Sequence, residues 1–320
     1  MTTARVSRIM DPMTTQEKFK APFVTADGQA RATVALSALR TLWFNTGTLC
    51  NLTCANCYIE SSPRNDSLVY LTTAEVAGFL DEIARDDLPT REIGLTGGEP
   101  FMNPDIMPIM EMVLARGFSL LVLTNAMRPM MRHRQELRAL RAAHGDRLTI
   151  RVSVDHHDRR MHEEERGPGS WEPMMTGLKW LSAHGFNLHL AGRTRWGEAE
   201  ADLRSGYARL CAAEGINIDA DDPQALMLFP EMDAYTPVPE ITTACWGILG
   251  VDPGDMMCAT SRMVVRHRGD DLPSVMACTL IAHDAGFNRG RTLAEAAGPV
   301  ALNHPHCARF CVLGGGACSR

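Results

Sequence analysis

The sequence predicts an α/β fold with parallel strands, followed by a small α+β region at the C-terminal end. Strand-like and helix-like patterns alternate along most of the chain, as in βαβ units with right-handed crossovers. A length of 320 residues is sufficient for one α/β domain of about 200 to 250 residues and a small additional domain. After Pro230 the composition changes, and cysteines recur from Thr242 onward. We expect an N-terminal arm at residues 1–39, the α/β domain at 40–235 and a cysteine-rich region at 240–320.

Each element is predicted from its own local pattern. The segment 40–45 alternates and carries β-favouring residues, so it is the first predicted strand. Thr72 and Glu75 have capping-box spacing, which predicts a helix that begins there and ends near 86–89. Similar patterns predict strands at 91–96, 118–123, 148–155, 186–192 and 224–229, and helices at 104–115, 133–143, 171–184 and 198–213.

The composition excludes several classes of protein. The net charge is −6, with 22% charged and 45% hydrophobic residues, which is typical of a soluble globular protein and gives no basic excess for nucleic-acid binding. No apolar run is long enough to span a membrane. The first thirty residues lack the apolar core of an export signal. We therefore expect a cytoplasmic protein whose ten cysteines serve metal sites rather than disulfides.

Three cysteines directly follow the first predicted strand. Cys50, Cys54 and Cys57 have the spacing C-x3-C-x2-C, and thiolates this close in sequence can reach one metal centre. A closed structural site needs four ligands, so three leave one position open for another molecule. A zinc knuckle or buried free thiols are the alternative interpretations of the triad alone.

A second motif follows one helix and one strand later. Gly97-Gly98-Glu99-Pro100 ends a predicted strand, where glycines expose backbone groups and Glu99 adds a carboxylate that can bind an ammonium group. Together with the triad, this motif resembles the radical S-adenosylmethionine (SAM) superfamily. The resemblance implies a partial (β/α)6 barrel resembling a TIM barrel, with a 4Fe–4S cluster on the triad. It also implies that the GGE motif holds the SAM amino group.

The resemblance also implies further SAM-binding residues. Asn125, Ser153 and Asp155 fall at the carboxyl ends of predicted strands, where such barrels place their active residues. The family usually has an aromatic residue or histidine before the third cysteine, whereas this chain has Asn56 there and Tyr58 two places later. The two arginines after the next strand are candidates for the SAM carboxylate: Arg193 and Arg195.

Other polar clusters in this region have structural interpretations. His156, His157 and His162 have no further ligand at metal-binding spacing, so we interpret them as polar loop residues. The charged stretch 159–166 is interpreted as a solvated face.

Six cysteines remain in the C-terminal region, with a cysteine, a strand, a turn and a second strand ending in cysteine. This arrangement is similar to the Twitch or SPASM extensions of radical SAM enzymes, and it implies one auxiliary 4Fe–4S cluster. Zinc is the alternative occupant. Spacing does not decide which of the last three candidates take part, nor whether Cys245 does. The candidate ligands are Cys258, Cys278, Cys307, Cys311 and Cys318.

These features lead to one functional hypothesis and two alternatives. The resemblance implies reductive cleavage of SAM to a 5'-deoxyadenosyl radical, hydrogen abstraction, and oxidation or cross-linking of a peptide or small molecule. Such an enzyme needs a reductant such as flavodoxin or ferredoxin, and we expect no nucleic-acid or membrane partner. The alternatives are an iron–sulfur electron-transfer protein without SAM chemistry and a zinc-stabilised scaffold. No residue is assigned to catalysis beyond cofactor binding.

Overall fold

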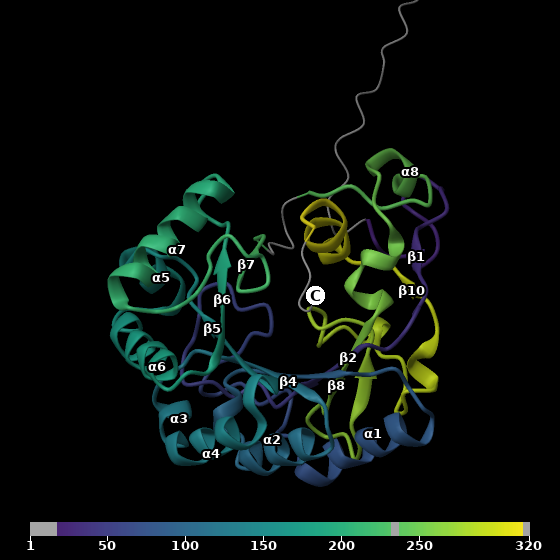
Figure 1. The fold of residues 1–320 in the computed structure, drawn as a ribbon. Helices are drawn as coiled ribbons and strands as arrows, with labels where there is room; N and C mark the ends of the chain where they lie inside the picture. Colours follow the sequence, from purple (N-terminus) through teal and green to yellow (C-terminus); the bar gives the residue numbers. More distant parts are fainter. Residues whose placement is uncertain (1–17, 232–236, 316–320) are drawn as a thin grey trace, which may run out of the picture.

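The computed structural model describes residues 18–231 and 237–315, and its centre is a curved sheet (Figure 1). Within these residues the sheet has eight strands in the order β7-β6-β5-β4-β3-β2-β8-β9. All neighbours pair in parallel except β9, which is antiparallel to β8. The predicted α/β fold is confirmed. The strands are β1 (Thr33–Val34), β2 (Thr41–Asn45), β3 (Glu92–Thr96), β4 (Ser119–Thr124), β5 (Leu148–Ser153), β6 (Asn187–Arg193), β7 (Leu226–Phe229), β8 (Ser261–Val265), β9 (Ser274–Met276) and β10 (Val300–Ala301).

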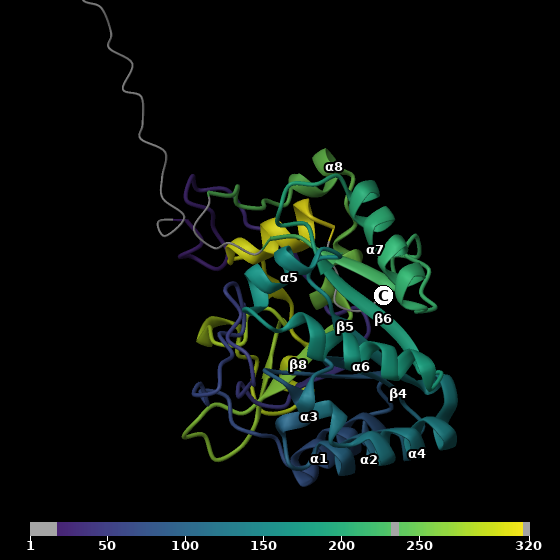
Figure 2. The ribbon, with the colours of Figure 1, turned by 90° about the vertical axis from the view of Figure 1, so that its left-hand side faces the viewer.

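Helices cover the convex outer face of the sheet, and its concave face is turned toward the centre of the molecule (Figure 1). Helices α1, α2 and α4 lie side by side along the bottom of both views (Figures 1 and 2). The predicted capping box is present, because the Thr72 side chain accepts from the Glu75 N–H and Glu75 accepts from the Thr72 N–H. The α-helices are α1 (Thr73–Arg85), α2 (Ile106–Ala115), α3 (Arg128–Met131), α4 (Arg134–His144), α5 (Arg159–Arg166), α6 (Trp171–Ala183), α7 (Glu200–Glu214) and α8 (Cys245–Leu249), and Cys307–Leu313 is π-helical.

Strand alternation separates two apolar clusters. On β2, Leu42 and Phe44 belong to the cluster under the helices, whereas Trp43 belongs to the cluster on the inner side. Gly94 pairs with Trp43, and a Cβ on Gly94 would lie 2.2 Å from the Trp43 ring. The glycine thus makes room for a large side chain on the inner face.

The C-terminal region continues the sheet. Strand β8 pairs with β2, so the predicted hairpin of β8 and β9 extends the sheet at the edge opposite β7. The described part of the N-terminal arm packs against this region: β1 pairs with β10, and the buried Arg31 forms an ion pair with Glu240. Residues 18–39 are therefore held by contacts with the C-terminal quarter of the chain.

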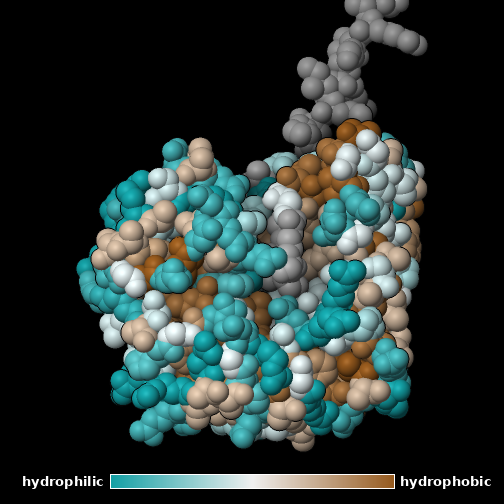
Figure 3. Space-filling view, viewed as in Figure 1, coloured by the Kyte–Doolittle hydropathy of each residue, from teal (hydrophilic) through white to brown (hydrophobic). Residues whose placement is uncertain are grey.

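Helix α8 carries two exposed apolar side chains. In α8, Ile248 is 78% and Leu249 is 43% exposed, and apolar surface is visible over this helix in Figure 3. Among the described residues, every helix is too short or too polar to cross a membrane.

Candidate active site

The three cysteines of the triad lie in the loop after β2, at the carboxyl edge of the parallel sheet. Cys50 is buried, and Cys54 and Cys57 are partly exposed. All three line a hollow of about 650 Å³, open solvent included. Ligands of open parallel sheets bind at this edge. The other lining residues are Leu52, Tyr58, Ile59, Ser61, Thr96, Gly97, Gly98, Leu123, Thr124, Asn125, Ser153, Glu165, Arg166 and Arg193.

The glycine pair brings the end of β3 against the cysteine loop. The Gly98 N–H donates to Gly47 O at 2.8 Å, and the Glu99 N–H donates to Leu49 O at 3.1 Å. Gly97 has φ +146°, which non-glycine residues rarely adopt. A Cβ on Gly98 would lie 2.3 Å from Leu49 O. The motif therefore fixes the position of the loop that carries the triad.

Replacing Gly98 with alanine should push the cysteine loop away from β3. We expect a loss of about 1–3 kcal/mol in the free energy of unfolding, as for other overpacked sites, together with poorer metal loading. Gly78→Ala is the matched control: it lies inside α1, and a Cβ there would have no other atom within 4 Å, so the change should be neutral or stabilising by up to about 1 kcal/mol. Urea unfolding of the metal-free proteins measures both. Equal stability of the two variants would contradict the predicted close approach.

The environment of the sulfur atoms suits thiolates bound to a metal cluster. The Leu52 N–H donates to Cys50 Sγ at 3.4 Å, and the Ser61 N–H donates to Cys57 Sγ at 3.3 Å, the kind of contact that stabilises a ligating sulfur. Burial raises the pKa of the Cys50 thiol to about 12 and also raises the pKa of Cys54. The free thiols of Cys50 and Cys54 therefore stay protonated at neutral pH, and a bound metal would make them thiolates.

The spacing of the sulfurs favours a cluster over one ion. Four thiolates around a single zinc lie about 3.8 Å apart, as follows from a tetrahedron with Zn–S of about 2.3 Å. Among the described residues, the one group of three or more candidate ligands that all lie within 4.8 Å of one another contains no cysteine. At least two sulfurs of the triad therefore lie more than 4.8 Å apart, which is too far for ligands of a single zinc ion and compatible with a polynuclear iron–sulfur core.

Some of the other residues predicted to bind SAM line the triad hollow, and others lie outside its lining. Tyr58, Asn125, Ser153 and Arg193 line it with the two glycines. The rest lie outside its lining: Glu99, Pro100, Asp155 and Arg195.

The carboxylate of Glu99 faces β4. It accepts hydrogen bonds from Thr124 Oγ1 at 2.9 Å and from the Asn125 N–H at 2.9 Å, and burial raises the pKa of Glu99 to about 7. In this structure Glu99 therefore joins the ends of β3 and β4. Pro100 begins the short buried turn that follows.

Two functional candidates in the charged stretch 159–166 were missed. The expected solvated face is wrong for Glu165, which is 2% exposed, and for Arg166, which lines the hollow. Both lie in the last turn of α5, whose N-cap is Asp158. Asp158 is a residue type favoured at helix N-caps, so it was a local signal for a helix that the sequence analysis did not use, and it does not show which face of the helix is buried.

Glu165 holds the cysteine loop. Its carboxylate accepts from the Asn56 N–H at 2.9 Å and from Asn56 Nδ2 at 2.8 Å, and Arg193 donates to Asn56 O at 3.0 Å. Asn56 is thus directed to α5 and β6, whereas Tyr58 lines the hollow. The family's usual aromatic position has a structural role here, and the aromatic ring at the site comes from Tyr58.

A buried charged network lies beneath this contact. Arg166 donates to Asp155 at 2.5 Å, and Arg193 Nε lies 3.4 Å from Asp155. Burial alone would raise the pKa of Asp155, but the two arginines hold it below its usual value. Arg195 lies further out, 3.8 Å from Glu165 and 3.5 Å from Glu231, with its side chain 31% exposed. Removing one member would leave a buried charge uncompensated, at a cost of about 3–5 kcal/mol.

Four of the C-terminal cysteines converge on a second hollow. Cys258 precedes β8, Cys278 follows β9, and Cys307 and Cys311 lie four residues apart on the π-helical segment. All four line a hollow of about 360 Å³ that is otherwise mainly apolar. Cys245 is not among its lining residues, and Cys318 lies outside the described residues.

The four thiols share the features of the triad. Burial raises the pKa of Cys258 to about 11 and of Cys307 to about 12. The Leu280 N–H donates to Cys278 Sγ at 3.4 Å. The four thiols fit a fully protein-ligated metal cluster.

A third hollow, of about 640 Å³, lies between the first two along the inner face of the sheet. It shares Tyr58, Ser153 and Arg166 with the triad hollow. Leu280 lines both this hollow and the one with the four cysteines. A molecule bound here would lie between the two cysteine sites.

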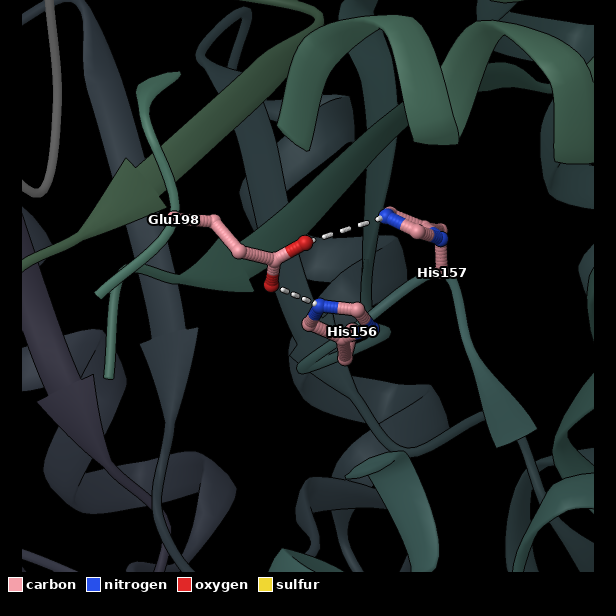
Figure 4. A group of neighbouring side chains, drawn as sticks. All are labelled: His156, His157 and Glu198. Atoms are coloured by element: carbon pink, nitrogen blue, oxygen red, sulfur yellow. Dashed lines mark hydrogen bonds and ion pairs between the residues drawn. The ribbon is translucent and has the colours of Figure 1, made fainter. Parts of the chain in front are cut away.

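His156, His157 and Glu198 form a compact polar group after β5 (Figure 4). Nε2 of His156 lies 2.5 Å from Glu198, and Nε2 of His157 lies 3.9 Å from it. The Asp158 N–H donates to His156 Nδ1 at 2.8 Å, so in the neutral ring the proton is on Nε2, which donates to Glu198. A metal-binding Nε2 must be free of its proton, and this hydrogen-bond pattern favours a structural role for the group.

The fold and these sites define an α/β protein with three cysteines around one hollow at the carboxyl edge of a parallel sheet. The family model for the radical SAM superfamily matches residues 44–192. The matched part begins within β2 and ends within β6, and it includes the triad and the Gly97–Gly98 pair.

Curated relatives match a stretch of similar length. The chain is 32% identical over 143 residues to the antilisterial bacteriocin subtilosin biosynthesis protein AlbA of Bacillus subtilis, covering 44% of this chain and 30% of AlbA. It is 32% identical over 145 residues to the AdoMet-dependent heme synthase of Methanosarcina barkeri, covering 44% and 38%. For mycofactocin maturase MftC of Mycobacterium ulcerans the identity is 29%, covering 43% and 35%. This chain thus spans only 30% to 38% of the length of these relatives.

Solved structures share the fold over a longer part. Streptococcus suis SuiB bound to S-adenosylmethionine has a TM-score of 0.58 at 12% identity, covering 79% of this chain and 63% of SuiB. The structure of anSMEcpe with bound AdoMet has a TM-score of 0.57 at 11% identity, covering 80% and 79%. At these identities the likeness establishes the fold alone.

Proposed function

We propose that the protein is a radical SAM enzyme that cleaves SAM reductively and removes a hydrogen atom from its substrate. The observation that carries the proposal is the hollow of the triad, where three thiols and the Gly97–Gly98 backbone face one space. Three protein ligands leave one iron of a 4Fe–4S cluster open. When bound, the cluster supplies the electron that splits SAM into methionine and a 5'-deoxyadenosyl radical.

The residues of the hollow would bind and orient SAM. Gly97 and Gly98 offer backbone groups to the methionine amino group, and Glu99 keeps this edge in place through β4. Arg166 and Arg193 would bind the carboxylate, since both guanidinium groups line the hollow. Arg195 does not line it. Ser153 and Asn125 would bind the ribose or the carboxylate, and the ring of Tyr58 provides an apolar face for the adenine.

The four C-terminal cysteines would hold an auxiliary 4Fe–4S cluster. Their support is the shared hollow and the N–H donated to Cys278. Full ligation by protein leaves no iron open for substrate, so the cluster would serve electron transfer. Cys307 and Cys311 are the proposed last two ligands, because both line this hollow, whereas Cys318 lies outside the described residues.

The substrate would occupy the hollow between the two cysteine sites. Its mixed lining, with Leu123, Phe229 and Leu280 beside Arg166 and Arg193, suits either a small molecule or one residue of a peptide. The names of AlbA and MftC describe a bacteriocin biosynthesis protein and a mycofactocin maturase, which favours a peptide. The expected reaction on the substrate is oxidation or cross-linking.

One assay tests the function. Anaerobically reconstituted protein, reduced with dithionite, should convert SAM to 5'-deoxyadenosine and methionine, measured by chromatography with mass detection. A brown, iron-loaded protein that forms no 5'-deoxyadenosine would favour the electron-transfer protein without SAM chemistry. A colourless protein that retains zinc would favour the scaffold.

A further inference from the structure

The strongest charged patch beside the triad lies on α3 and the start of α4. Arg128, Arg132, Arg134 and Arg138 are all exposed, and the surface over these helices is largely hydrophilic in Figure 3. Residues 128–138 contain four arginines and one glutamate, a net charge of +3 with histidine neutral. The glutamate, Glu136, lies 3.7 Å from His133. Within the described ranges, none of the four arginines forms an ion pair.

This surface adjoins the cysteine loop through direct contacts. Met127, the residue before α3, accepts from Asn51 Nδ2 at 3.6 Å. Asn51 follows Cys50 in the sequence, and its Oδ1 accepts from Asn125 Nδ2 at 2.9 Å. Two residues of the cysteine loop, Thr53 and Ala55, are exposed to solvent. A protein seated on α3 would therefore lie next to the triad.

The charge of the surface selects the kind of partner. The chain as a whole has a net charge of −6, so a local excess of +3 orients an approaching acidic protein toward this face. Electron-carrier complexes bury small areas and depend on such steering. A nucleic acid fits less well, because the patch covers only α3 and the first turns of α4, while phosphate binding needs a longer basic track.

We propose that the four arginines, the α3–α4 basic surface, form the docking site for an acidic one-electron carrier protein that reduces the triad cluster. This inference rests on the proposed function. The contact places the carrier against the residues that flank Cys50, outside the hollow that SAM would fill. One electron passes from the reduced carrier to the oxidised cluster, with no other co-reactant.

The test compares two double variants with the same change in net charge. Arg132→Glu with Arg134→Glu reverses the surface. Arg209→Glu with Arg291→Glu is the control, at exposed arginines on α7 and after β9. Stopped-flow bleaching of the reconstituted protein by reduced flavodoxin gives the rate of cluster reduction without SAM or substrate. At low ionic strength we expect flavodoxin to reduce the surface variant at least about tenfold more slowly than wild type. The control variant should be reduced at a rate within about twofold of wild type. The difference between the two variants should become smaller at high salt.

The outcomes separate this inference from the proposed function. Reduction by dithionite should change less than about threefold in either variant, because a small reductant needs no docking face. Equal slowing of flavodoxin in both double variants would overturn the docking site. So would a surface variant that loses binding to a 20-nucleotide single-stranded RNA but keeps flavodoxin reduction. Failure of SAM cleavage with dithionite would instead count against the proposed function. The docking site would still be tested by the rates of cluster reduction, because these are measured without SAM.

Discussion

Replacing Cys54 with alanine is expected to lower 5'-deoxyadenosine formation by more than about 100-fold. Removing a residue that only hydrogen-bonds to a metal ligand lowers metal affinity or activity by about 10- to 100-fold. Cys54 would be one of three direct protein ligands, so its removal should have a larger effect. Its thiol lines the hollow beside Arg166. The two remaining thiolates cannot hold an exposed 4Fe–4S cluster, so iron should fall from about eight to about four atoms per chain.

Cys211→Ala is the control for this variant. Cys211 is buried in α7, 2% exposed, and lines none of the three hollows. Its loss should cost about 1 kcal/mol of stability as a small core truncation while iron content and SAM cleavage persist. If the Cys54 variant kept both its iron and its SAM cleavage, the triad would not be the site of the chemistry.

The positions of the strands along the chain were predictable because the signals are local. Each strand from β2 to β7 shows its own pattern, and the capping box of Thr72 and Glu75 lies within four residues. The triad and Gly97–Gly98 were identified in the same way, since spacing within one loop is written directly in the sequence. Their mutual contact, Gly98 N–H to Gly47 O, follows from the neighbouring positions of β2 and β3 in the sheet.

The missed residues depend on contacts between distant parts of the chain. Glu165 and Arg166 look like members of a solvated charged face because their neighbours in sequence are charged. Their partners, Asn56, Asp155 and Arg193, come from the cysteine loop and two strands. Burial of such a set requires all the partners at once, so no single segment shows it.

The last cysteines posed a similar problem. Spacing did not choose among Cys307, Cys311 and Cys318, because a ligand set assembled from a hairpin and a distant helical turn has no fixed period. The structure brings Cys307 and Cys311 together with Cys258 and Cys278 around one hollow.

Replacing Cys278 with alanine should separate the two cysteine sites. The variant is expected to lose the auxiliary cluster, so iron should fall from about eight to about four atoms per chain. SAM cleavage should stay within about threefold of wild type, because the triad hollow shares no residue with the hollow of the four cysteines. Conversion of the substrate should be blocked, since Leu280 places the substrate hollow directly beside the lost cluster. Iron analysis, EPR of the reduced protein and the 5'-deoxyadenosine assay measure these effects.

Cys245→Ala is the matched control for Cys278→Ala, as a C-terminal cysteine that lies outside the hollow. It should keep about eight iron atoms and full SAM cleavage. Full iron in the Cys278 variant, or zinc in place of iron in the wild type, would contradict an auxiliary cluster at this site. Loss of SAM cleavage in a Cys278 variant whose circular dichroism and thermal unfolding are unchanged would mean that the two sites act as one. Loss accompanied by unfolding would instead show that the four-cysteine site stabilises the sheet edge formed by β8 and β9, and a cluster with a purely electron-transfer role would then be excluded.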